Sequence, residues 1–153
     1  MRKATLLLLS FVPIVCITLV REAPLPNREA MLVPLQSLVT LCSVGWGGHG
    51  VYIAIGLVAN VFLFVPLGFA LSRIGDIRWL LLIPLLVSLA VEFAQYYTRL
   101  GTFEVDDLIC NTIGGITGYE LGISLSGQRE GDYKVITAYL IALGLCCLKS
   151  MLL

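Results

Sequence analysis

Four side chains that can carry charge or hydrogen-bond recur at helical spacing within a largely apolar stretch of the chain. They are Glu92, Gln95, Tyr96 and Arg99, at positions i, i+3, i+4 and i+7. This spacing places all four on one face of an α-helix. A carboxylate at membrane depth is energetically expensive and by default indicates a functional site. The face therefore predicts either a ligand-binding surface or a structural ion pair between Glu92 and Arg99, with the guanidinium group reaching outward.

The next helix that the sequence predicts carries a second polar face. Asp107, Asn111, Gly114 and Gly118 fall at i, i+4, i+7 and i+11. A short loop joins the two helices, so they should pack antiparallel with their polar faces in contact. Asn60 lies near the middle of an earlier apolar run. We predict that these faces form one outward-facing polar pocket, lined by Asn60, Glu92, Gln95, Arg99, Asp106, Asp107 and Asn111.

Most of these polar residues also have a purely structural interpretation. Asp106 or Asp107 could cap the N-terminus of its own helix, where a negative charge is favourable. Asn60 and Asn111 could join neighbouring helices through hydrogen bonds worth about 1 kcal/mol each. We expect no metal or cofactor, because the five cysteines form no C-x-x-C pair and no histidine lies near the acidic residues in the sequence.

Glycines follow the polar residues along the same predicted helix. Gly114, Gly118 and Gly122 form two overlapping G-x-x-x-G units. Such a strip lets another helix approach closely, either within one chain or in a homodimer. We favour packing within the chain, because the strip shares a face with Asp107 and Asn111.

The composition indicates which solvent surrounds these helices. The chain has 153 residues, of which 58% are hydrophobic and 13% are charged. A chain of this size cannot hide so much apolar surface from water, so a bilayer is the expected environment. The formal net charge is zero, which argues against nucleic acid as a partner. The sequence therefore predicts an all-α, polytopic integral membrane protein with a single domain over residues 1–153.

The lengths of the apolar runs predict about five transmembrane helices and one short amphipathic helix at the membrane interface. The amphipathic helix is indicated by Leu32, Leu35, Leu38, Val39 and Cys42 at helical spacing, before a glycine-rich loop at 45–50. Basic residues slightly favour a cytoplasmic N-terminus and an extracytoplasmic C-terminus in the plasma membrane. The predicted spans are residues 4–20, kept as an uncleaved first span, and then 51–71, 79–98, 108–125 and 135–153.

Three stretches together resemble the VanZ-like family. The first is 32–38, before the second span, where Leu35 replaces an aromatic residue that is common in the family. The second is 60–69, which is similar to the motif N-x-x-x-F-x-P-L-G-F. The third runs from Glu92 to Gly118 and is similar to the family's E-x-x-Q, arginine, acidic loop and D-x-x-x-N-x-x-G. The resemblance is strongest over residues 32–122.

The resemblance implies a bacterial cell-envelope protein with a role in glycopeptide (teicoplanin) resistance or envelope homeostasis. We expect a non-enzymatic protein that binds membrane lipid, with Arg99 and the buried amides holding an anionic lipid or a lipid-linked cell-wall precursor at the outer leaflet. One alternative is an enzyme acting on a lipid-linked substrate, with Glu92 as the general base and Asp106 or Asp107 as the acid. Another is a small proton-coupled transporter with Glu92 as the proton carrier.

Overall fold

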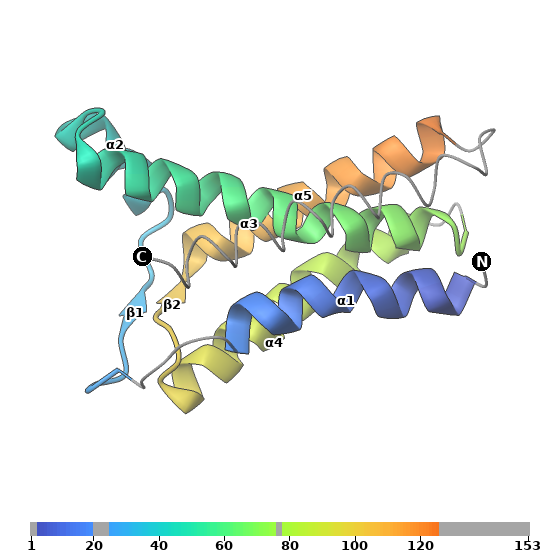
Figure 1. The fold of residues 1–153 in the computed structure, drawn as a ribbon, viewed down its shortest axis with the longest axis horizontal. Helices are drawn as coiled ribbons and strands as arrows, with labels where there is room; N and C mark the ends of the chain where they lie inside the picture. The colour runs from blue at the N-terminus through green and yellow to red at the C-terminus, as the bar shows by residue number, and fades with distance from the viewer. Residues whose placement is uncertain (1–2, 20–24, 76–77, 126–153) are drawn as a thin grey trace.

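Helices form most of the structure, a computed structural model that describes residues 3–19, 25–75 and 78–125. In this part of the chain α1, α3, α4 and α5 run along the long axis of the molecule, and α2 lies at one end with two short strands (Figure 1). The helical class predicted from the sequence is confirmed. The elements are α1 (Lys3–Leu19), β1 (Ala30–Met31), α2 (Gln36–Val44), α3 (Gly48–Ser72), η1 (Arg78–Leu81), α4 (Leu82–Thr98), β2 (Phe103–Glu104) and α5 (Val105–Ser124).

The apolar core lies where α3 meets α1 and α5. Phe64 and Leu67 of α3, Ile14 of α1 and Tyr119 of α5 belong to one buried cluster. The Tyr119 hydroxyl donates a hydrogen bond to the backbone carbonyl oxygen of Gly75, 3.3 Å away. An aromatic ring can therefore be buried here while its polar end keeps a partner.

The glycine strip of α5 lies directly against the backbone of α3. Gly114 and Gly118 are buried, and a Cβ atom at either position would collide with the carbonyl oxygen of Val61 or Val65. A Cβ atom at Gly122 would likewise collide with the Ser72 side chain. The strip thus packs helices within the chain, and α3 would have to move away before the same strip could join two copies.

Two short parallel strands are a feature that the sequence analysis did not predict. Ala30 and Met31 of β1 pair with Phe103 and Glu104 of β2. The Phe103 N–H donates to the Glu29 carbonyl oxygen at 3.0 Å. These bonds hold the segment before α2 against the connection between α4 and α5.

Some element boundaries differ from those predicted. α3 begins at Gly48, so the second half of the predicted loop at 45–50 is helical. Gly50 is buried there against Gly45. The last predicted span of the described region begins at Val105 instead of Leu108, so Asp106 and Asp107 lie in its first turn. Carboxylates are favourable in that position. The predicted span at 135–153 lies outside the described residues.

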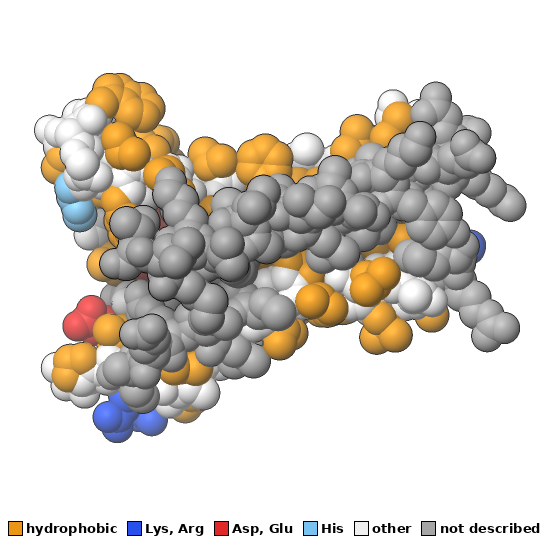
Figure 2. Space-filling view, in the orientation of Figure 1, with side chains coloured by type: hydrophobic (Ala, Val, Ile, Leu, Met, Phe, Trp, Pro, Cys, Tyr) orange, Lys and Arg blue, Asp and Glu red, His pale blue; other side chains and the backbone are white. Residues whose placement is uncertain are grey.

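Two described helices are long and apolar enough to cross a membrane, α3 and the segment Trp79–Thr98 formed by η1 and α4. The apolar part of α1 is shorter. The described residues therefore do not establish the predicted count of about five. Figure 2 shows hydrophobic side chains along the flanks of the molecule and charged side chains near its two ends.

Candidate ligand-binding cavity

A cavity of about 480 Å³ lies between the first half of α3, the β1–α2 segment and the start of α5. Its α3 wall presents a mixed polar and apolar face, because His49, Tyr52, Gly56 and Asn60 recur at helical spacing. The opposite wall is more polar and includes Met31, Gln36, Ser37, Thr40, Glu104 and Asp107. The α3 wall also includes Ile53 and Leu57, so the space has a partly apolar side and an acidic side.

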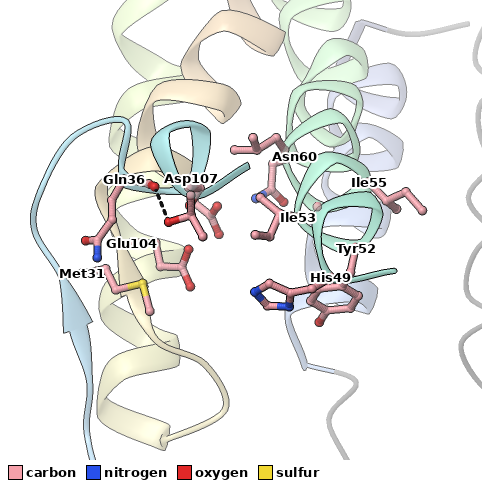
Figure 3. A pocket seen from close by; sticks show the side chains of 13 residues that line it. Met31, Gln36, His49, Tyr52, Ile53, Ile55, Asn60, Glu104 and Asp107 are labelled. Atoms are coloured by element: carbon pink, nitrogen blue, oxygen red, sulfur yellow. Dashed lines mark hydrogen bonds between the residues drawn. The ribbon is translucent and has the colours of Figure 1, made fainter. Parts of the chain in front are cut away.

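Asp107 and Asn60 face each other across this cavity (Figure 3). The Asn60 side chain lies within interaction range of the Asp107 carboxylate, between α3 and the first turn of α5. Glu104 lies close enough to repel the charge on Asp107. The predicted pocket residues Asn60 and Asp107 are thus brought together, in a setting that concentrates negative charge.

Asp106 does not line the cavity itself and instead holds α2 in place. Its carboxylate accepts the backbone N–H of Leu35 at 2.5 Å and that of Ser37 at 2.7 Å. Leu35 has a φ of 61°, and its own side chain cannot cap α2, which begins at the next residue. The buried Asp106 therefore supplies the cap for a helix about 70 residues away in sequence. This cap differs from the cap of its own helix that the sequence suggested.

Removing this carboxylate is expected to release the start of α2. Asp106→Ala leaves two backbone N–H groups without their acceptor, and losing a helix cap costs about 0.5–2 kcal/mol. We expect faster amide hydrogen exchange across residues 35–44, measured by mass spectrometry. The matched control is Glu120→Ala, which removes an exposed carboxylate from the other end of α5. Equal exchange in α2 of Asp106→Ala and of the wild type would contradict the assigned role.

Glu92 is buried, with 1% of its surface exposed, and supports β2 instead of lining the cavity. Its carboxylate accepts the backbone N–H of Glu104 at 2.9 Å. No ion pair joins Glu92 to Arg99 among the described residues. Glu92 therefore positions Glu104, which does line the cavity.

Arg99 and Gln95 belong to the pocket predicted from the sequence, but neither lines this cavity. α4 ends at Thr98, and Arg99 takes up a left-handed conformation with a φ of 61° and an exposed side chain. Its carbonyl oxygen accepts the Leu25 N–H at 2.7 Å. Gln95 packs beside the buried Gly101. Both residues shape the turn between α4 and α5.

Asn111 lies deeper in the bundle and joins α5 to α4. Its side-chain amide donates to the Ser88 hydroxyl at 2.9 Å, and both side chains are buried. Its amide oxygen has no hydrogen-bond partner among the described residues. Asn111 therefore joins two helices through a hydrogen bond. This was the structural alternative to a place in the pocket.

Most of the cavity lining was not predicted from the sequence, including the polar side chains of His49, Tyr52 and Glu104. The spacing of His49, Tyr52, Gly56 and Asn60 on one helical face could have identified the α3 wall. Glu104 could not be found in this way, because its position depends on the pairing of β1 with β2.

These features define a class of helical protein. Its described residues include two helices able to cross a membrane, and an amphipathic cavity lies at one end of the helices. The sequence profile of the VanZ/LLP1 family matches residues 5–126, and the chain belongs to that family. The chain is similar to Protein VanZ of Enterococcus faecium, with 29% identity over 101 residues, which are 63% of this chain. The matched part spans 60% of the length of that relative. No solved structure matches the chain.

Proposed function

We propose that this protein is a multi-pass membrane protein of the bacterial cell envelope that contributes to glycopeptide resistance by binding a lipid or lipid-linked cell-wall precursor at the outer leaflet. Membership of the VanZ/LLP1 family supports the resistance role. The observation that carries the binding role is the cavity, because it combines an apolar wall with polar groups, as a lipid headgroup site requires.

Exposed apolar and aromatic side chains support a position of the cavity at the membrane surface. Leu32, Val33 and Val39, on the segment around α2, are each more than 60% exposed. Trp46 before α3 and Trp79 beyond its other end are 79% and 76% exposed. Tryptophan is enriched at both membrane–water interfaces. In this arrangement α2 lies along the interface and α3 crosses the bilayer.

Two exposed arginines at the cavity end of the molecule can meet the phosphate of such a lipid. Arg28 lies over the rings of Tyr96 and Tyr97, 6.0 and 5.7 Å from their centroids. Arg99 follows the end of α4 in the same region, since Leu25 is bonded to its carbonyl oxygen. Guanidinium groups suit phosphate geometry. In this proposal the anionic group stays outside the cavity, on the arginines.

We further propose that this end faces outward and that the N-terminus is cytoplasmic. The polar turn around Gly101 then lies outside, and the end of α5 lies inside. Reporter fusions after Gly101 and after Ser126 test this orientation, with exterior and cytoplasmic signals expected in that order. Reversed signals at both sites would contradict it.

Expression in a susceptible bacterium is expected to raise tolerance to a lipoglycopeptide more than tolerance to an unrelated antibiotic. We expect this because a bound or remodelled lipid changes the lipids that the drug contacts at the outer leaflet. The measurement is the minimal inhibitory concentration of both drugs, with membrane expression verified by immunoblot. Unchanged tolerance at verified expression would leave the resistance role without support. Co-purified lipid, sought by native mass spectrometry, tests the binding role separately.

A further inference from the structure

We infer that the cavity recognises the ammonium group of an aminophospholipid headgroup, an inference that rests on the proposed lipid-binding function and adds the chemical class of the bound group. The sequence analysis assigned the pocket to an anion. The cavity itself presents Asp107 and Glu104, and no lysine or arginine lines it among the described residues. Its chemistry therefore suits a cation better than a phosphate.

The carboxylates around the cavity repel one another, and a bound cation relieves that repulsion. Asp107 interacts electrostatically with Glu104, with Asp106 and with the buried Glu92 behind β2. The charge of Asp106 is already stabilised by the two N–H groups of α2. Asp107 and Glu104 are the carboxylates whose residues line the open space. They form the acidic floor that an ammonium group would contact.

The geometry favours an ammonium group attached to a lipid over a bare metal ion. An ammonium group presents three N–H donors, and Asp107, Glu104 and Asn60 offer oxygen acceptors from separate elements. No group of side chains among the described residues is arranged to hold a metal ion. The α3 wall adds Ile53 on the same side as these oxygens, so the same space has an apolar surface for the part of a lipid near the headgroup (Figure 3).

The two ends of one zwitterionic headgroup would then contact different parts of the protein. The ammonium group enters the cavity beside Asp107, and the phosphate stays outside the cavity, at the end of the molecule that carries Arg28 and Arg99. A headgroup in which a hydroxyl replaces the ammonium keeps the phosphate contact but loses the charge-assisted bond in the cavity. Selectivity between these two headgroups is therefore the signature of the inference.

The test is native mass spectrometry of the purified full-length protein in detergent with equimolar phosphatidylethanolamine and phosphatidylglycerol. A charge-assisted hydrogen bond contributes about 1.5–3 kcal/mol, so we expect at least about a tenfold preference for phosphatidylethanolamine. Asp107→Asn keeps the shape of the side chain and removes its charge, and it is expected to bring the ratio close to one. Glu120→Gln makes the same charge change on an exposed part of α5 and is expected to keep the wild-type ratio.

Further measurements distinguish a lipid headgroup from a free cation. They also distinguish the ammonium site from lipid binding in general. Free ethanolamine or Mg²⁺ at the same concentration is expected to leave the lipid adduct in place, and displacement by either would overturn the assignment to a lipid. A wild-type preference for phosphatidylglycerol, or an Asp107→Asn ratio equal to that of the wild type, would overturn the ammonium site. Either result would leave lipid binding intact, whereas the absence of any lipid adduct would contradict the proposed binding function as well.

Discussion

Gly118→Ala is expected to lower the thermal stability of this protein, although alanine is the better helix former. Helix propensity alone predicts a gain of about 1 kcal/mol for glycine to alanine within a helix. In this structure a Cβ atom at Gly118 would collide with the carbonyl oxygen of Val65, a backbone atom that can move only if α3 moves. Overpacking of this kind costs about 1–3 kcal/mol or more. The sign of the effect therefore reports on the α3–α5 contact.

The control for this prediction is another helical glycine with free space around it. Gly56 lies in α3, and a Cβ atom there would have no neighbour within 4 Å. Gly56→Ala is expected to keep or raise the unfolding temperature measured in detergent, and Gly114→Ala is expected to lower it in the same way as Gly118→Ala. A rise in unfolding temperature for all three variants would show that α5 does not pack on α3 through its glycines.

Glu92→Ala is expected to destabilise the protein through β2 and not through Arg99. The substitution removes the acceptor of the Glu104 N–H inside the protein, and an unsatisfied buried donor costs about 1–3 kcal/mol. Glu92→Gln keeps an acceptor oxygen and removes a buried charge, so it should retain wild-type stability. Chemical denaturation of the protein in mixed micelles measures the free energy of unfolding.

A double-mutant cycle separates this role of Glu92 from the ion pair that its sequence spacing suggested. Arg99 is exposed, so Arg99→Gln should be nearly neutral. The effects of Glu92→Gln and Arg99→Gln should add within about 0.5 kcal/mol, as they do for independent sites. A coupling energy well above that value would restore the ion pair and contradict the geometry described here.

Helical spacing placed Glu92 and Gln95 on α4 and Asp107 and Asn111 on α5, and it failed where α4 itself stopped. Placing Arg99 on the face of Glu92 required a helix that continues through residue 99. The helix ends at Thr98, and Arg99 has a left-handed conformation. Such an end depends on the turn that follows, which in turn depends on Leu25 and Gly101. Spacing within α4 carries no information about those contacts.

The different roles of Asp106 and Asp107 could not be predicted from the sequence, for a related reason. Neighbouring residues in a helix point in directions about 100° apart. Asp107 therefore faces the cavity, whereas Asp106 reaches the start of α2. The sequence indicated carboxylates that are favourable at a helix start. It could not indicate which distant backbone N–H groups would donate hydrogen bonds to Asp106.

Filling the cavity without disturbing the fold tests the central claim most directly. Gly56 lies on the α3 face that lines the cavity and has open space around it, so Gly56→Phe should fold and occupy the cavity. Val58→Phe is the matched control, because Val58 is 54% exposed on the same helix and lies outside the cavity lining. The measurement is lipoglycopeptide tolerance of a susceptible bacterium that expresses each variant at equal membrane levels. We predict that Gly56→Phe loses the tolerance that the wild type and Val58→Phe confer, and full tolerance with Gly56→Phe would contradict a role for the cavity in resistance.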